Sequence, residues 1–418
     1  MSLVTTATRM WLTRSFKPFV FHADDGRTPP DYAATPRPGL YVHIPFCRSI
    51  CDFCPYCKVE FRQDLFDAYI DALKREIELV SDRFDSPPEV TSLYFGGGSP
   101  ALAADRFGEI TGLLRKHYRI TDGIGVELHP RDVTAEPLQK LKDAGVTRVS
   151  IGIQSFQRKF QALLGREPID IPAMREALSR VAFETVSMDF IFALPGQTAD
   201  DLKSDFRTAF ENGANHVAIY PFIDFTFTPT PLNAMKPREK RRLLDEITAF
   251  FRQLGCRRDS IWTFADGPAH KYSSMTRDNF IGFGCSATTL LRDQFRVNTF
   301  SVEAYCKRLA DGLLPTALRC DFTVRQRMIY WLFWRAYTTR LAVDDFEACF
   351  GVPLKTVFST ELKLAKLAGM ITEQDRVLEL TDKGAFYFHY YEGFYTLAYI
   401  DKMWGLLRHT PFPAGMTL

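Results

Sequence analysis

Short apolar runs alternate six times with longer amphipathic stretches between about residues 39 and 254, and this alternation limits the fold more than any other feature. The short runs have the length and residue content of buried strands, and the longer stretches have helical spacing of apolar side chains. Strand-helix units in series predict parallel strands. We therefore expect an α/β fold, a partial (β/α)6 barrel with functional residues at the carboxyl ends of its strands. The expected strands are 39–46, 91–95, 125–129, 148–154, 185–194 and 216–222, and the expected helices are 64–84, about 107–114, 136–144, 171–181, 199–212 and 238–254.

The pattern changes near residue 321 of the 418-residue chain. Ahead of that point, 280–286 reads as a strand or turn and 302–309 as a short helix. Beyond it come three helical segments and a strand, an order typical of a mostly helical, winged-helix-like domain. We expect three parts: an ordered N-terminal arm at 1–38, the barrel with an extension at 39–320, and the C-terminal domain at 321–418.

Composition excludes several classes of protein. The chain has 52 basic and 50 acidic side chains, whereas a nucleic-acid groove needs clustered excess Lys and Arg. No apolar run is long enough for a transmembrane segment, and the N-terminus has no signal-peptide pattern. An odd number of cysteines, nine, favours a reducing cytoplasm.

Four of the nine cysteines fall within eleven residues: Cys47, Cys51, Cys54 and Cys57. Spacings of three and two place the first three thiols on one tight loop after a strand, where they can hold an iron-sulfur cluster with one iron left open. A zinc site is the alternative, because Cys51, Cys54 and Cys57 are also evenly spaced. Spacing alone leaves both readings open. The remaining five are expected to be small buried hydrophobic residues: Cys256, Cys285, Cys306, Cys320 and Cys349.

A series of short motifs resembles one known family. The segment Tyr41-Val-His43-Ile-Pro45-Phe-Cys47 with C-x3-C-x2-C is similar to the radical S-adenosylmethionine (SAM) superfamily, in particular its HemN-like branch of oxygen-independent coproporphyrinogen III dehydrogenases. The resemblance runs from about residue 39 to 310 and favours iron-sulfur over zinc. Its further motifs, in order, are Phe95 to Pro100, Val126 to Pro130, Ser150 to Phe156, Gly165-Arg166, Met188 to Thr198 and Ile281 to Ala287.

The resemblance implies a [4Fe-4S] cluster held by Cys47, Cys51 and Cys54, with SAM chelating the open iron. Electron transfer into SAM then yields a 5'-deoxyadenosyl radical, which the barrel shields from water and oxygen. The resemblance does not assign a catalytic role to any particular side chain. Contacts to the cluster-bound SAM are expected from Tyr41, Gly97 and Glu127, and contacts to a second SAM or the shared pocket from Phe53, Gly98, Ser99, Gln154, Arg166 and Asp189.

The same residues also have plainer interpretations. Gly96 to Gly98 alone is typical of a strand-to-helix turn. A polar side chain at a strand end, such as Glu127 or Asp189, can equally satisfy a hydrogen bond in the core. His43 is expected to pack beside the cluster rather than to bind it, and Cys57 to be a spare thiol.

Two departures separate the chain from the dehydrogenases. Pro55 and Tyr56 stand between the third and fourth cysteines, and the N-terminal arm has no obvious counterpart. Our first hypothesis is therefore a relative of the class C methyltransferases and cyclopropanases, in which the second SAM donates a methyl or methylene group. The alternatives are coproporphyrinogen III oxidative decarboxylation, heme degradation, a non-catalytic heme chaperone and a redox-sensing winged-helix regulator.

Aromatic residues are abundant, with 36 Phe, and they concentrate in the last hundred residues. They indicate either a well-packed small core or a wall for a large apolar or aromatic substrate, such as a tetrapyrrole, a quinone or a natural-product intermediate. The expected electron donor is a reductase, a flavodoxin or a ferredoxin.

Overall fold

A parallel sheet runs through the centre of the computed structural model, which describes residues 3–32, 37–267 and 278–418. Its six consecutive parallel strands lie side by side in chain order, as the alternation predicted. Apolar side chains fill both faces of these strands, which is typical of parallel sheets covered by helices. The strands are β2 (Gly39–Ile44), β6 (Ser92–Gly97), β8 (Ile124–Leu128), β9 (Arg148–Gln154), β10 (Thr185–Phe192) and β11 (His216–Pro221).

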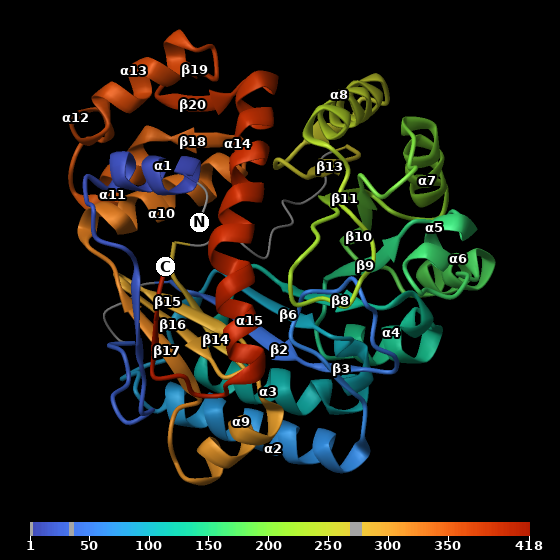
Figure 1. The fold of residues 1–418 in the computed structure, drawn as a ribbon. Coiled ribbons are helices and arrows are strands. Elements are labelled where there is room, and N and C mark those ends of the chain that lie inside the picture. The colour runs from blue at the N-terminus through green and yellow to red at the C-terminus, as the bar shows by residue number, and fades with distance from the viewer. Residues whose placement is uncertain (1–2, 33–36, 268–277) are drawn as a thin grey trace.

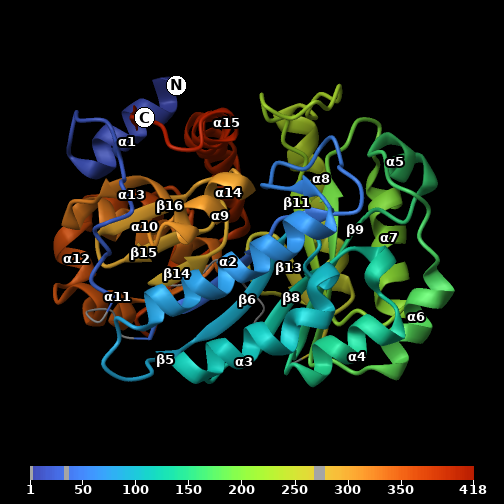
Figure 2. The same ribbon diagram turned by 90° about the horizontal axis from the view of Figure 1, so that it is seen from below.

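Crossover helices cover the outside of the curved sheet (Figures 1 and 2). The α7 helix shows how local sequence sets a boundary: Thr198 accepts from the backbone of Asp201, whose side chain accepts in return, and this capping box starts the helix. The crossover helices are α2 (Gln63–Ser81), α3 (Phe107–His117), α4 (Ala135–Asp143), α6 (Ile171–Arg180), α7 (Ala199–Glu211) and α8 (Pro237–Gln253). All six expected strand-helix units are present.

The sheet continues beyond the six predicted strands. Strand β14 (Phe280–Phe283) pairs in parallel with the free edge of β2, so the segment read as a strand or turn is a strand followed by a turn. Antiparallel strands β15 (Thr288–Leu291), β16 (Gln294–Asn298) and β17 (Thr316–Asp321) then extend it. The expected short helix is α9 (Val302–Ala310).

Both ends of the chain join this sheet. Strand β1 (Val20–Ala23) pairs with β17 on one side and with β21 (Gly415–Thr417) on the other. Helix α1 (Leu3–Thr13) lies against the C-terminal helices α10 (Val324–Tyr337) and α14 (Asp382–Tyr395). Positions 1–2 and 33–36 of the expected arm, and 268–277 of the expected barrel unit, lie outside the described residues.

A smaller unit follows β17. Its three-stranded antiparallel sheet, in the order β18-β20-β19, packs with helices around its own apolar core, which includes Trp331, Phe346 and Leu354. This arrangement is the expected winged-helix-like, mostly helical fold. Its elements are α10 (Val324–Tyr337), β18 (Arg340–Ala342), α11 (Val343–Phe350), α12 (Leu354–Val357), α13 (Ser359–Leu367), β19 (Ile371–Gln374) and β20 (Val377–Leu380).

A long C-terminal helical segment, red in Figure 1, then returns across the barrel. It consists of α14 (Asp382–Tyr395) and α15 (Asp401–His409), joined by a π-helical turn. The sequence analysis did not anticipate it. Across the described residues, no helix combines the length and apolar content that a membrane crossing needs.

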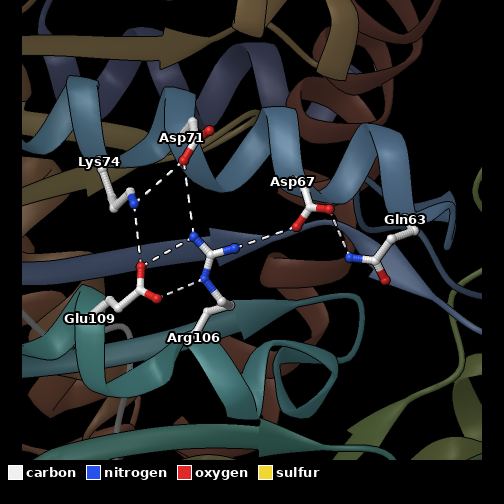
Figure 3. A network of polar contacts seen from close by, with 6 residues as sticks. All are labelled: Gln63, Asp67, Asp71, Lys74, Arg106 and Glu109. Atoms are coloured by element: carbon white, nitrogen blue, oxygen red, sulfur yellow. Dashed lines mark hydrogen bonds and ion pairs between the residues drawn. The ribbon is translucent and has the colours of Figure 1, made fainter.

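An ion-pair network joins α2 to α3 on the outside of the barrel (Figure 3). Arg106 pairs with Glu109 at 3.0 Å and with Asp67 at 3.4 Å, and Lys74 reaches Glu109 at 3.3 Å. Surface pairs of this kind contribute about 0–1 kcal/mol each. The network therefore helps to align the two helices and carries no sign of chemistry.

Candidate functional site

The first three clustered cysteines lie on one loop at the carboxyl end of β2. Two backbone bonds close the base of this loop, because Val59 N donates to Pro45 O and Phe61 N donates to Cys47 O, both at 2.8 Å. Within the loop, Cys54 N donates to Cys51 O at 3.4 Å. Cys47, Cys51 and Cys54 are all half-buried free thiols. The structure thus brings together the three predicted cluster ligands.

The pKa values of Cys47 and Cys54 reflect their burial and the nearby charges of the other cysteines. Burial raises the pKa of Cys47 to about 12, and the neighbouring Cys54 and Cys51 raise it further. Burial also raises the pKa of Cys54. Three mutually repelling thiolates need a cation between them, and a cationic iron cluster supplies one.

The backbone at Gly98 packs closely against Cys47. A Cβ added to Gly98 would lie 2.5 Å from Phe46 O and 2.9 Å from Cys47 Sγ, closer than real Cβ atoms approach. Gly98 N donates instead to Ile44 O at 2.8 Å. Any side chain at this position would push Cys47 aside, so the donor set and its surroundings fit a [4Fe-4S] cluster.

Glu127, at the end of β8, faces the glycines that follow the core of β6. Gly97 N donates to Glu127 Oε2 at 3.1 Å, and Tyr94 Oη donates to Oε1 at 3.1 Å. Gly97 has φ +120°, a backbone conformation that side-chain-bearing residues rarely adopt. Burial raises the pKa of Glu127, while these two hydrogen bonds lower it. The carboxylate is therefore held in one orientation, beside backbone that a ligand can approach.

Tyr41 of β2 lies next to this carboxylate. Its ring stacks on that of Tyr94 with centroids 6.4 Å apart, and its hydroxyl lies 3.0 Å from His43 Nδ1. The expected contacts Tyr41, Gly97 and Glu127 thus form one group.

Asp189, within β10, is a second carboxylate, and it is half-buried. Ser150 Oγ donates to both of its oxygens at 2.8 Å, and Ser187 Oγ donates to Oδ1 at 3.2 Å. Burial raises the pKa of Asp189 to about 7, with Ser150 and Ser187 opposing the shift. The charge of Glu127 raises the pKa of Asp189 further, so the two carboxylates are close enough to interact electrostatically.

Arg166 packs against the ring of Phe53, on the cysteine loop. The Arg166 guanidinium lies 5.7 Å from the centroid of the Phe53 ring, and Nη1 donates to Gly152 O at 3.3 Å. Its Nε is buried and has no hydrogen-bond partner among the described residues. A buried cationic donor without a partner is costly, so this atom fits an anionic ligand group such as a SAM carboxylate.

Two of the expected contacts have plainer roles. Gln154 ends β9 with φ +69°, and its side-chain amide folds back over Gly152. The buried Ser99 hydroxyl donates to Asp132, which also pairs with Arg48 at 3.4 Å. Ser99 is thus engaged within the protein, as the plainer interpretation of these polar residues allowed.

Helix α15 contributes side chains that the sequence pattern did not predict for the site. Trp404 lies 5.9 Å from Tyr56 and 6.4 Å from Phe225, measured between ring centroids. Arg408 donates from Nη2 to the backbone oxygens of Pro55 and Tyr56. The C-terminal helix therefore forms an aromatic wall against the cysteine loop, and the aromatic content of the last hundred residues was its only sequence signal.

The fourth clustered cysteine lies apart from the first three. Cys57 is buried with its Sγ 3.8 Å from that of Cys285, which follows β14. A hydrogen bond from Cys285 lowers the pKa of Cys57 well below its usual range against the opposing effect of burial, and His43 and Ser286 lower it further. Of the other scattered cysteines, Cys320 is also buried, Cys256 and Cys306 are half-buried, and Cys349 is exposed, so the prediction of burial was wrong for Cys349.

Comparison with known proteins agrees with this geometry. The pattern described as "Radical SAM superfamily" matches residues 41–209. The crystal structure of coproporphyrinogen III oxidase (HemN) from Escherichia coli superimposes with a TM-score of 0.74 at 22% identity, covering 96% of this chain and 98% of the other. That likeness establishes the fold.

Three curated proteins resemble the chain over most of its length. The heme chaperone HemW of Bacillus subtilis is 26% identical, covering 82% of this chain and 95% of its own. The oxygen-independent coproporphyrinogen III oxidase of Pseudomonas aeruginosa is 28% identical, with 82% of each chain covered. Anaerobilin synthase of Escherichia coli O157:H7 is 29% identical, covering 85% of this chain and 83% of its own.

The matched pattern identifies a radical SAM domain at residues 41–209, and the parallel barrel and the three-cysteine loop fit such a domain. A radical SAM fold implies a [4Fe-4S] cluster and SAM as cofactors. Over most of its length the chain resembles HemN-type proteins.

Proposed function

We propose that this chain is a radical SAM enzyme that oxidises a tetrapyrrole, with Cys47, Cys51 and Cys54 as ligands of the cluster. When bound, the reduced cluster supplies the electron that cleaves SAM, and the resulting 5'-deoxyadenosyl radical abstracts hydrogen from the substrate. A flavodoxin, ferredoxin or reductase would deliver that electron. The observation that carries the proposal is the half-buried group of Tyr41, Gly97 and Glu127 beside the cysteine loop.

The side chains of this group have distinct roles in the proposal. Glu127, fixed by Gly97 N and Tyr94 Oη, accepts hydrogen bonds from the amino group of SAM. Gly97 allows the methionine portion to approach the backbone, because any Cβ there would lie 2.8 Å from the His43 ring. Tyr41 packs over the same group and keeps water away from it.

The proposal assigns different roles to different parts of the chain. Residues 39–320 hold the cofactors, and residues 321–418 provide, through α15, an apolar wall that faces the cysteine loop. Trp404 and Phe225, whose rings stack with an interplanar angle of 16°, offer a flat aromatic surface of the kind that suits a macrocycle. The arm at 1–38 ties the two parts together through β1 and α1.

Tetrapyrrole chemistry is favoured over the quinone and natural-product alternatives because all three full-length relatives are named for it. Oxidative decarboxylation of coproporphyrinogen III is the reaction to test first. In each step a propionate side chain would lose a hydrogen atom to the radical, then carbon dioxide and one electron, leaving a vinyl group; the reaction therefore also needs an external one-electron acceptor to take that electron.

The test is product analysis under strict anaerobiosis. Reconstituted protein with SAM and dithionite would be supplied separately with coproporphyrinogen III and with heme. We expect 5'-deoxyadenosine and carbon dioxide in the first reaction. An opened macrocycle from heme would move the assignment to heme degradation, and heme that binds but stays intact, with neither substrate consumed, would favour a chaperone.

Methyl transfer with a second SAM is the second candidate. The buried Arg166 Nε without a partner favours it, because this donor lies with Phe53 and is suited to a carboxylate. Equilibrium dialysis would then give about two SAM molecules per wild-type chain and about one for Arg166→Met. S-adenosylhomocysteine formed alongside 5'-deoxyadenosine would support methyl transfer, whereas one SAM in both proteins would contradict it.

A further inference from the structure

Three potential metal ligands from distant parts of the sequence meet in the core. His43 lies on β2, Cys57 follows the cluster loop, and Cys285 follows β14, the strand that pairs with β2. One ring nitrogen and the two sulfurs lie within 4.8 Å of one another. The residues are only 3%, 5% and 0% exposed, so this group is separate from the half-buried cluster ligands.

The distance between the two sulfurs suits a metal ion. Cys57 Sγ and Cys285 Sγ are 3.8 Å apart, which is also within thiol hydrogen-bond distance, and Cys57 Sγ donates to Phe300 O at 3.2 Å, a bond that the thiolate would give up on binding a metal. Two zinc-sulfur bonds of about 2.3 Å at the tetrahedral angle place their sulfurs about 3.8 Å apart. A disulfide would require the sulfurs to approach to about 2.05 Å, so the observed separation matches a shared metal far better than a covalent bond.

His43 is oriented for the same purpose. Its Nδ1 lies 3.0 Å from the Tyr41 hydroxyl, an outer contact of the kind that fixes a metal-binding imidazole. Its Nε2 lies 2.9 Å from Cys57 O and 3.4 Å from Ser286 Oγ, so binding of a metal would replace the contact with that carbonyl by a bond to the ion. Ser286 has φ +58°, rare for a residue with a side chain, and this conformation turns its hydroxyl toward the three ligands as a fourth.

The charges of the three ligands indicate which ion the site would bind. Two thiolates and a neutral imidazole neutralise one divalent cation, and a neutral group is the form that a buried site tolerates. Thiolate and imidazole together favour zinc among the common divalent ions. We propose that His43, Cys57 and Cys285 bind a structural zinc ion, with Ser286 as the fourth ligand.

The surrounding hydrogen bonds support this role. Tyr69 Oη donates to His43 O at 2.7 Å and accepts from Cys285 N at 3.1 Å. Glu76 accepts from Gly284 N at 2.7 Å, and so holds the turn that carries Cys285. A metal here fastens the end of the cluster loop, three residues beyond Cys54, to the β2-β14 pair, and this function does not depend on the reaction that the enzyme performs.

The test is the metal content of the full-length protein, purified anaerobically and measured by inductively coupled plasma mass spectrometry. We expect about one zinc and about four iron per reconstituted chain. Cys285→Ser should lose most of the zinc while keeping the iron. Cys320→Ser, a change at another buried cysteine, is the matched control and should keep both metals.

Two further measurements guard against misfolding and misassignment. A Cys51→Ala chain should retain its zinc, which excludes the cluster ligands as its source. Wild-type protein grown with cobalt should show a thiolate-to-cobalt absorption band. Wild-type protein without zinc and without that band, a Cys57-Cys285 disulfide in unreduced peptides, or equal zinc loss from Cys320→Ser would each overturn the proposal. Loss of 5'-deoxyadenosine formation with zinc intact would count against the proposed function alone.

Discussion

Arg408, near the C-terminus, donates from Nη2 to the backbone oxygen of Tyr56 at 2.9 Å. The same guanidinium lies 4.7 Å from the centroid of Phe227, so it is both stacked and hydrogen-bonded. Its target is the part of the cluster loop just beyond Cys54. The last helix of the chain thus contacts the loop that carries the three proposed cluster ligands.

Removing this contact should loosen the loop. For Arg408→Ala we expect iron to be lost to an external chelator about three- to tenfold faster than from the wild type, since a lost charge-assisted bond costs on the order of 1 kcal/mol. Lys402→Ala changes an exposed cation on the same helix and is the control. Equal rates for wild type and Arg408→Ala would show that α15 does not restrain the loop.

Glu127→Gln tests the SAM pocket without altering its shape. The change removes the negative charge that faces Gly97, and we expect SAM affinity to fall about 10- to 100-fold while iron content stays the same. Isothermal titration of reconstituted protein would measure this effect. Glu136→Gln, at an exposed position on α4, should bind SAM normally. Wild-type affinity in Glu127→Gln would remove this carboxylate from the site.

Glu76 gives the stability of the fold a specific pH dependence. Burial raises its pKa to about 7, against hydrogen bonds from Tyr305, Gly284 and Asn298 that lower it. The folded state therefore binds the proton more tightly than the unfolded state, and stability falls as pH rises from about 4.5 to about 7. The carboxyl contributes on the order of 1–3 kcal/mol to this fall.

Glu76→Gln should reduce that part of the slope, because the amide does not ionise. Urea unfolding of both proteins at several pH values would measure it. Comparison of the two proteins isolates Glu76 from the other buried carboxyls, including Asp189. Parallel stability curves for wild type and variant between pH 5 and 7 would contradict the assignment.

The local sequence pattern predicted the strand-helix units of the barrel. The strands that became β2, β6 and β8 to β11 are short apolar runs, and each is followed by a helix whose apolar face is visible in the sequence. Cys47, Cys51 and Cys54 are close in sequence, so the chain itself brings them together. Features set by adjacent residues were therefore recoverable without the structure.

Features that depend on contacts between segments far apart in the sequence could not be predicted from the sequence. Strand β16 is short and contains Arg296, whose burial depends on Asp24 in the N-terminal arm, 3.5 Å away. Helix α14 has aromatic side chains on all sides and lacks the single apolar stripe that marks a surface helix. The group of His43, Cys57 and Cys285 exists only because β14 pairs with β2.

The central claim is that Cys47, Cys51 and Cys54 hold a cluster that cleaves SAM. Its most direct test is the release of 5'-deoxyadenosine by anaerobically reconstituted protein given SAM and dithionite, compared between wild type and Cys51→Ala. We expect release from the wild type and none above background from Cys51→Ala. Equal release from both proteins would contradict the assignment of the cluster to this loop.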